Sequence, residues 1–121
     1  MDARRNPRRT LGATGESLAA DLYRKLGFTI VDRNWRCNSG ELDLVVASGD
    51  LLVFCEVKTR SSDFFGSPAE AVGYAKQARL RRLAAAWMGE HHAGQRNVRF
   101  DVVAVLIGKS EPQVTHLPDA F

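Results

Sequence analysis

Four charged residues interrupt two apolar runs of this sequence, where charge is normally excluded. Glu41 and Asp43 lie in the first run, Glu56 and Lys58 lie in the second, and the turn-forming residues 47–50 separate the two. Burying a charge costs free energy unless a partner or a bound ion compensates. Unshielded carboxylates that lie close together repel one another, and a divalent cation relieves this repulsion. These residues therefore predict a site for a divalent cation.

The two apolar runs are predicted to form a β-hairpin, because the Ser, Gly and Asp of residues 47–50 favour a turn. With a four-residue turn, the expected pairs across the hairpin are Val46 with Leu51, Asp43 with Phe54 and Glu41 with Glu56. Side chains alternate along a strand, so all four charged side chains would project from one face. The opposite face would be wholly apolar and would hold Leu42, Leu44, Leu51, Val53, Cys55 and Val57. The charges would then converge at the end of the hairpin away from its turn.

A helix is expected before the hairpin, from Leu11 or Thr14 to Leu26, with Gly27 as its C-terminal cap. Its apolar stripe at helical spacing consists of Gly15, Leu18, Ala19, Leu22 and Leu26. Glu16 lies at the shoulder of this stripe. One interpretation is that Glu16 is a favourable charge in the first helical turn, near the positive end of the helix dipole.

The remaining segments complete an α/β pattern. Further strands are expected at residues 28–33, 98–107 and 113–117, the last of them at a sheet edge. A second helical region is expected from the capping box Ser67–Glu70 to about Met88, with a bend near Gly73. The order α-β-β-β-α-β-β predicts an α/β domain with a mixed central sheet flanked by helices. Asp101, inside an apolar strand, is expected to pair with Arg99 or another arginine, or else to support the charged hairpin.

Composition sets broad limits on the class of protein. At 121 residues, 45% hydrophobic and 26% charged, the chain is long enough for one core, so we expect a basic tail at residues 1–10 and a single domain at residues 11–121. No apolar run reaches the roughly 18 residues of a membrane span. The two cysteines form no CxxC motif, which favours a cytoplasmic location. A net charge of +3 and a pI near 9.2 are compatible with a polyanionic partner.

The order Asp43, then Glu56-x-Lys58, resembles the signature of the PD-(D/E)XK nuclease superfamily, although Leu42 stands where the superfamily name places Pro. Further motifs surround this signature. They are Gly15-Glu16, Ala19-Ala20, Tyr23, Gly27, Arg33-Asn34, Arg36, residues 40–44, residues 54–60 and residues 99–103. Together they make nearly the whole chain similar to the YraN family of small bacterial proteins.

This resemblance implies a restriction-endonuclease-like fold, close to that of Holliday junction resolvases, and a metal-dependent endonuclease. Asp43 and Glu56 would bind Mg²⁺ or Mn²⁺, Lys58 would position or activate the water, and Glu16 and Glu41 would assist. The expected substrate is DNA, in a structured or branched form. The side chains expected to contact nucleic acid are Arg33, Arg36, Arg60 and Lys76, while a solvated strand edge is the alternative for the first two.

Two other functions fit the same residues. The chain could be a non-catalytic nucleic-acid-binding module with a nuclease-like fold, or a structural protein whose charges pair internally. Resolvase relatives act as symmetric dimers, but no segment of this sequence marks a homodimer interface. The substrate structure and the sequence preference of any cut are likewise not encoded in a recognisable motif.

Overall fold

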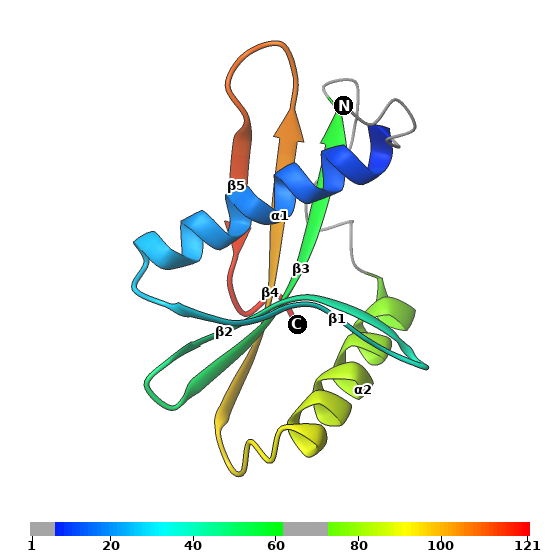
Figure 1. Ribbon diagram of the computed structural model, residues 1–121, viewed down its shortest axis with the longest axis vertical. Helices are drawn as coiled ribbons and strands as arrows, with labels where there is room; N and C mark the ends of the chain where they lie inside the picture. The colour runs from blue at the N-terminus through cyan, green and yellow to red at the C-terminus, as the bar shows by residue number, and fades with distance from the viewer. Residues whose placement is uncertain (1–6, 62–72) are drawn as a thin grey trace.

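The computed structural model describes residues 7–61 and 73–121, which form a five-stranded sheet and two helices (Figure 1). The elements in chain order are α1 (Pro7–Lys25), β1 (Thr29–Cys37), β2 (Gly40–Ser48), β3 (Leu51–Ser61), α2 (Tyr74–Glu90), β4 (Asn97–Ile107) and β5 (Gln113–Leu117). This order is the α-β-β-β-α-β-β pattern expected from the sequence, and the α/β class is confirmed.

The strands lie in the sheet in their sequence order, β1-β2-β3-β4-β5. Neighbours are antiparallel except for β3 and β4, which run parallel. A parallel pair needs a crossover connection, and α2 lies within the connection between these two strands. The sheet is therefore mixed, with β2, β3 and β4 inside it. β5 lies at one edge, as the sequence predicts.

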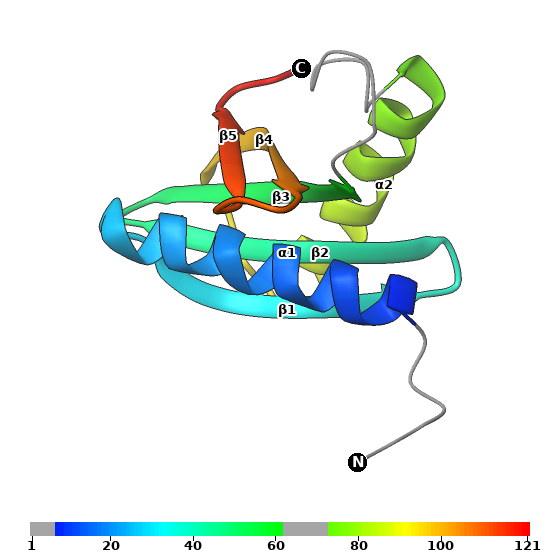
Figure 2. The same cartoon turned by 90° about the horizontal axis from the view of Figure 1, so that it is seen from above.

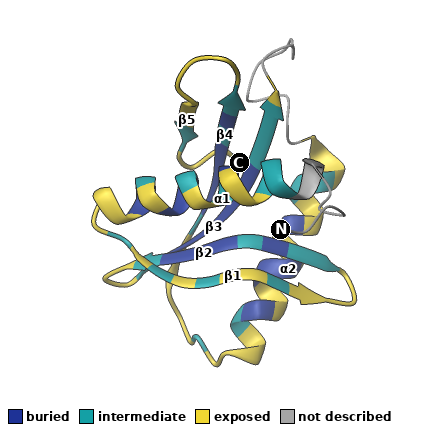
Figure 3. Cartoon of the chain, turned by 45° about the horizontal axis from the view of Figure 1, so that its top comes forward, coloured by how far each residue is buried: buried dark blue, intermediate teal, exposed yellow. Residues whose placement is uncertain are grey.

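The core has two layers, one on each face of the sheet. On one face α1 packs through Ala19, Ala20 and Tyr23, and on the other α2 packs through a stripe that includes Leu83 and Trp87 (Figure 2). The outward side chains of β1 are largely exposed, whereas those in the middle of β2 and β3 are buried (Figure 3). The hairpin formed by β2 and β3 is thus packed between the two helices.

Helix α1 begins earlier and ends differently from the sequence prediction. It starts at Pro7 rather than at Leu11 or Thr14, so Glu16 is not in the first helical turn, and the interpretation of Glu16 as a first-turn charge is wrong. Leu26 is 52% exposed rather than part of the packed stripe, because the helix ends at Lys25 and the chain turns at Gly27, where φ is +93°. Residues 1–6 of the expected basic tail lie outside the described residues.

The described part of α2 runs from Tyr74 to Glu90, with Gly73 in an extended conformation immediately before it. The capping box Ser67–Glu70 lies outside the described residues. The inward stripe of α2 is confirmed, since its buried residues are Leu80, Leu83, Ala84 and Trp87. Neither of the helices in the described ranges is long and apolar enough to cross a membrane.

The hairpin register differs from the prediction by two residues. The turn consists of Gly49 and Asp50 alone, and Ser48 pairs with Leu51. Gly49 has φ +58°, a left-handed conformation that glycine adopts without steric cost, and this allows the tighter turn. The pairs of Asp43 with Phe54 and of Glu41 with Glu56 are therefore wrong. Continuing the observed ladder by one residue brings Asp43 level with Glu56.

The prediction for the apolar face is confirmed at Leu44, Val53, Cys55 and Val57 and is wrong at Leu42. A shift of two residues leaves every side chain on its original face, because side chains alternate with period two. Leu44, Val53 and Cys55 pack in the cluster beneath α1, as expected for the apolar face. Leu42 instead packs in the cluster beneath α2, so the run predicted as wholly apolar is broken next to Asp43.

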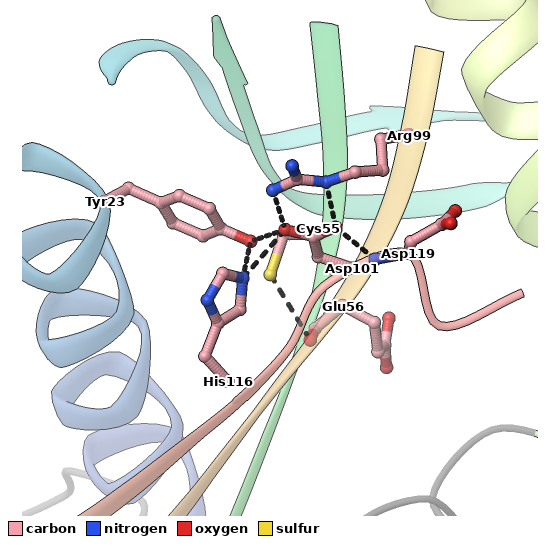
Figure 4. Close-up of polar contacts among 7 residues, drawn as sticks. All are labelled: Tyr23, Cys55, Glu56, Arg99, Asp101, His116 and Asp119. Atoms are coloured by element: carbon pink, nitrogen blue, oxygen red, sulfur yellow. Dashed lines mark hydrogen bonds and ion pairs between the residues drawn. The ribbon is translucent and has the colours of Figure 1, made fainter. Parts of the chain in front are cut away.

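Asp101 on β4 is fully buried and joins four parts of the chain (Figure 4). Its carboxylate accepts hydrogen bonds from the Arg99 guanidinium at 2.8 Å, from the Tyr23 hydroxyl at 2.6 Å and from the Asp119 backbone N–H at 3.0 Å, and it lies 2.8 Å from Nε2 of His116. Burial alone would raise the pKa of Asp101, but the hydrogen bonds from Arg99, Tyr23 and His116 outweigh it and hold the pKa below its usual range. The predicted ion pair with Arg99 is confirmed.

Candidate active site at the end of the hairpin

Three carboxylates, one from α1 and two from β2, converge where the β2–β3 ladder ends. Carboxylate oxygens of Glu16 on α1 and of Glu41 and Asp43 on β2 all lie within 4.8 Å of one another, and all three residues are half-buried. We call these three residues the carboxylate cluster. Oxygens bound to one Mg²⁺ at about 2.1 Å lie at most about 4.2 Å apart. Small side-chain movements would therefore bring the cluster around one cation, and its all-oxygen donor set suits Mg²⁺ or Mn²⁺.

Asp43 is positioned by the break in the β2–β3 ladder. The last backbone pair of this ladder is Leu44 with Cys55. Beyond that pair, Oδ2 of Asp43 accepts a hydrogen bond from the backbone N–H of Val57 at 2.9 Å. The side chain thus takes the place of a backbone partner.

Glu16 is positioned by an unusually close approach of α1 to the sheet. A methyl group built on Gly15 would overlap the Thr59 side chain on β3, so a glycine is required at this point of the helix. Asn34 on β1 donates a side-chain hydrogen bond that lowers the pKa of Glu16. Asn34 has φ +52°, a conformation that asparagine tolerates better than most residues. The absence of a side chain at Gly15 lets α1 approach the sheet, and the backbone conformation of Asn34 brings β1 to Glu16.

Replacing Gly15 by Ala is expected to destabilise the fold and to weaken Mn²⁺ binding. The added methyl must push α1 away from the stiff, β-branched Thr59, which costs about 1–3 kcal/mol and moves Glu16. Thermal melts and Mn²⁺ titration measure the two effects. The matched control is Gly12→Ala in the same helix, where no heavy atom lies within 4 Å of the added methyl. That change should be neutral or stabilising by up to about 1 kcal/mol. If the two variants behave alike, the close approach at Gly15 does not matter.

Glu56 on β3 lies close enough to the carboxylate cluster for its charge to raise the pKa of Asp43 and of Glu16, and Lys58 follows two residues later. The side chains of Glu56 and Lys58 share a face of the strand, because side chains alternate along it. Glu56 is buried and forms an ion pair of 2.6 Å between its Oε2 and Nζ of Lys76 on α2. Lys58 is half-buried and forms no ion pair with another residue of the ranges 7–61 and 73–121. Glu41, Asp43 and Glu56 are therefore brought near one another, while the role predicted for Lys58 stays a prediction.

The four side chains predicted to contact nucleic acid differ in their exposure and in their partners. Arg36 is 75% exposed and pairs with Glu41, with Nε 2.9 Å from Oε2. Lys76 pairs with Glu56. Arg33 is exposed, with Nη2 3.5 Å from the Ser17 hydroxyl, and Arg60 is half-buried near the end of β3. Arg36 and Lys76 are thus counter-ions of acidic residues at the site.

The carboxylates raise one another's proton affinity. Burial, and then the charge of Glu56, raise the pKa of Asp43 to about 8, although the Val57 N–H opposes this shift. Burial likewise raises the pKa of Glu16, against the hydrogen bond from Asn34, and the charge of Glu41 adds to the rise. Crowded carboxylates of this kind are stabilised by a proton or by a cation.

Without a divalent cation, stability is expected to fall as the pH rises from about 5 to about 8. The folded chain keeps the Asp43 proton up to about pH 8, whereas an unfolded aspartate has lost it above about pH 4. The folded state then binds more protons than the unfolded state, so the free energy of unfolding falls by on the order of 1 kcal/mol per pH unit. Thermal melts in EDTA across this range measure the slope.

The control for this pH dependence is Asp43→Asn, which cannot titrate and should show a shallower slope. Identical slopes for the native chain and the variant would mean that Asp43 ionises normally. Mn²⁺ competes with the proton on Asp43. The affinity of the chain for Mn²⁺ should therefore rise with pH, while the free energy of unfolding measured in EDTA falls.

The sequence predictions missed Asn34 and the pairing roles of Arg36 and Lys76. The weak signal for Asn34 was an asparagine inside a strand, since this residue is depleted in strands. Nothing in the sequence links Lys76 to Glu56, because they are 20 positions apart and meet only through the packing of α2 on the sheet.

Comparison with known proteins places this geometry in a family. The model of "Uncharacterised protein family UPF0102" matches residues 15–105, a region that begins at Gly15 and includes all the acidic residues of the site. The chain belongs to this family. It is 53% identical over 112 residues to a UPF0102 protein of Rhodococcus opacus (strain B4), covering 92% of this chain and 95% of that protein. It is also 59% identical over 96 residues to a UPF0102 protein of Beutenbergia cavernae, covering 79% and 81%.

The match to UPF0102 confirms the resemblance to the YraN family that the sequence motifs indicate. The family description and the names of these relatives state no activity. The chemistry of a UPF0102 protein must therefore be argued from its site.

Proposed function

We propose that this UPF0102 protein is a Mg²⁺- or Mn²⁺-dependent endonuclease that hydrolyses phosphodiester bonds in DNA, in a structured or branched form. The observation that carries the proposal is the convergence of Glu16, Glu41 and Asp43 near Glu56. Side chains that merely paired with one another would not leave two carboxylates with raised pKa values at a half-buried site. Such a site is costly for the fold and is suited to a cation.

The chain's own residues have separate tasks in this reaction. Asp43, which is fixed by the Val57 N–H, and Glu56 hold the cation, and Glu16 and Glu41 assist. When bound, the cation polarises the scissile phosphate and lowers the pKa of a water molecule. Lys58, on the same face of β3 as Glu56, positions the attacking water or stabilises the negative charge that develops on the phosphate.

DNA is the expected polyanion because positive charge surrounds an acidic centre. The chain carries a net charge of +3, and exposed Arg33 and Arg36 lie on β1 next to the cluster. Such side chains attract the phosphate backbone without reading its sequence. A branched form is favoured by the resemblance to resolvases.

Cleavage of a labelled nucleic-acid panel with Mn²⁺ tests the proposal. The panel holds single-stranded, linear duplex, flapped and four-way-junction DNA, with a duplex RNA of the same sequence. We expect the native chain to cut branched DNA faster than linear duplex, and Asp43→Ala and Lys58→Ala to cut none of them. The Lys109→Ala variant, changed at an exposed lysine beyond the end of β4, is the matched control and should cut like the native chain.

Each other outcome points to a different function. If the native chain cuts nothing but retards branched DNA on a gel, it is a binding module with a nuclease-like fold. If cutting persists in Asp43→Ala and Lys58→Ala, a contaminating nuclease is responsible. If the native chain neither cuts nor binds nucleic acid, the carboxylate cluster serves another purpose and the proposal is wrong.

A further inference from the structure

The face of α2 that carries Lys76 and Arg79 borders the candidate active site. Nζ of Lys76 lies 2.6 Å from Oε2 of Glu56, and Glu56 is close enough to Asp43 for its charge to act on that carboxylate. Arg79 follows Lys76 by three positions, so the two side chains are neighbours on the helix surface. The first two turns of α2 are therefore turned toward the carboxylates.

Gly40 lets Arg79 approach the turn between β1 and β2. A methyl group built on Gly40 would lie 3.9 Å from Cδ of Arg79 and 3.6 Å from Cδ1 of Leu83, so the aliphatic stem of Arg79 lies against this turn. Gly40 has φ +139°, a conformation that residues with a side chain rarely adopt. The next residue, Glu41, belongs to the carboxylate cluster. Arg79 is thus placed against the residue that precedes a member of the cluster.

The guanidinium of Arg79 is exposed and has no counter-ion. Arg79 forms no ion pair or hydrogen bond with another residue in the described part of the chain. Arg36 and Lys76, by contrast, are held by carboxylates of the site at 2.9 and 2.6 Å. Lys58 likewise forms no ion pair within the described residues, but it is half-buried and has a task at the attacking water in the proposed reaction. Of these four basic groups, Arg79 is both exposed and free to bind an anion from outside the chain.

Arg81, two positions later on α2, has different surroundings. Its guanidinium carbon lies 5.0 Å from the ring centre of Phe100 and 5.4 Å from that of Phe121. Residues two apart on a helix do not face the same way. Arg81 therefore covers aromatic rings near the C-terminus, and the basic run of α2 is not one uniform solvated face.

We propose that Arg79 binds a phosphate of the DNA backbone beside the scissile one. The inference rests on the proposed endonuclease function and adds a positioning residue to it. A guanidinium donates two parallel hydrogen bonds to a phosphate. Because the stem of Arg79 already lies against Gly40, less side-chain freedom is lost when the phosphate binds. Arg79 fixes the register of the DNA backbone at the carboxylate cluster without reading its sequence.

The salt dependence of DNA binding tests this contact. The Kd of a fluorescein-labelled four-way junction is measured in EDTA at several KCl concentrations. For Arg79→Gln the Kd should rise roughly tenfold, and the slope of log affinity against log salt should become shallower by about one, as expected for one lost phosphate contact. The matched control is Arg96→Gln, the same change at an exposed arginine near the β2–β3 turn, at the opposite end of the hairpin. Its slope should stay native.

Three results would overturn the inference. The first is a native slope for Arg79→Gln. The second is an equal change of slope for Arg96→Gln, because the loss of net charge alone would then explain both variants. The third is a loss of Mn²⁺ binding by Arg79→Gln in a titration, since Arg79 would then act by way of the carboxylates. We expect both variants to bind Mn²⁺ with the native affinity.

Chemical modification of the native chain covers the case in which Arg79→Gln does not fold. Phenylglyoxal reacts with accessible guanidinium groups. Bound four-way junction should protect Arg79 from this reagent, whereas Arg96 should react equally fast with and without DNA. An Arg79 that reacts at the same rate in both states would contradict the proposal.

The failure of this inference can be told from the failure of the nuclease proposal. A native chain that binds the junction through Arg79 but cuts no DNA after Mn²⁺ is added supports the role of Arg79 and refutes the nuclease. A native chain that cuts DNA, while Arg79→Gln keeps the native slope, supports the nuclease and refutes the role of Arg79. A native chain that binds no DNA refutes both.

Discussion

Replacing Asp43 by Asn is expected to abolish DNA cleavage while DNA binding persists or becomes tighter. The amide has the same shape, and its oxygen can still accept the Val57 N–H, so the end of the hairpin keeps its backbone. It lacks the charge that would hold a divalent cation with Glu16 and Glu41. Loss of several kcal/mol of transition-state stabilisation corresponds to a rate reduction of roughly a thousandfold. Binding is retained because one negative charge near the DNA phosphates is removed.

Single-turnover cleavage and gel retardation of the same four-way junction measure the two effects separately. The control is Asp50→Asn, the same change at the exposed turn of this hairpin, at the end opposite the carboxylate cluster. It should leave both measurements unchanged. Cleavage by Asp43→Asn at more than about a tenth of the native rate would exclude Asp43 as a cation ligand.

The Asp101→Asn substitution should produce the largest loss of stability. Asp101 is fully buried and accepts hydrogen bonds from Arg99, Tyr23 and the Asp119 backbone (Figure 4). The amide leaves the Arg99 charge without its partner and turns an N–H donor toward groups that are themselves donors. Breaking a buried pair of this kind costs about 3 kcal/mol, which lowers the melting temperature by roughly 10 °C in a domain of this size.

Urea unfolding and thermal melts at pH 7 measure this loss. Asp21→Asn, which breaks an exposed ion pair with Arg24, should change stability by less than about 0.5 kcal/mol. Tyr23→Phe removes one of the hydrogen bonds to Asp101. Its loss of stability should be about 1 kcal/mol, between the losses of Asp101→Asn and Asp21→Asn. A melting temperature for Asp101→Asn equal to that of Asp21→Asn would contradict the structural role given to the buried network.

The faces of the hairpin could be predicted from the sequence because they depend only on the alternation of side chains. Leu44, Val53, Cys55 and Val57 therefore share a face even though the turn is shorter than predicted. The register could not be predicted as safely, since residues 47–50 allow a turn of four residues or of two. The two turns differ only in backbone torsions, and the φ of Gly49 decides between them.

Contacts between distant elements explain the rest of what the sequence did not predict. The packing of α1 on Thr59 brings Glu16 to the cluster, and the packing of α2 brings Lys76 to Glu56. Neither contact has a periodic signal along the chain. The start of α1 at Pro7 was missed because residues 7–10 lack apolar anchors, although Pro at the first position of a helix is favourable.

The most direct measurement starts from the native chain bound to a 5′-labelled four-way junction in EDTA, followed by addition of excess Mn²⁺. If the carboxylate cluster binds a cation that drives hydrolysis, discrete cleavage products should form only after Mn²⁺ is added, and not with Asp43→Asn under the same conditions. If the native chain stays bound to the junction, as gel retardation would show, and the junction remains uncut after Mn²⁺ addition, the proposal of a metal-dependent endonuclease is contradicted.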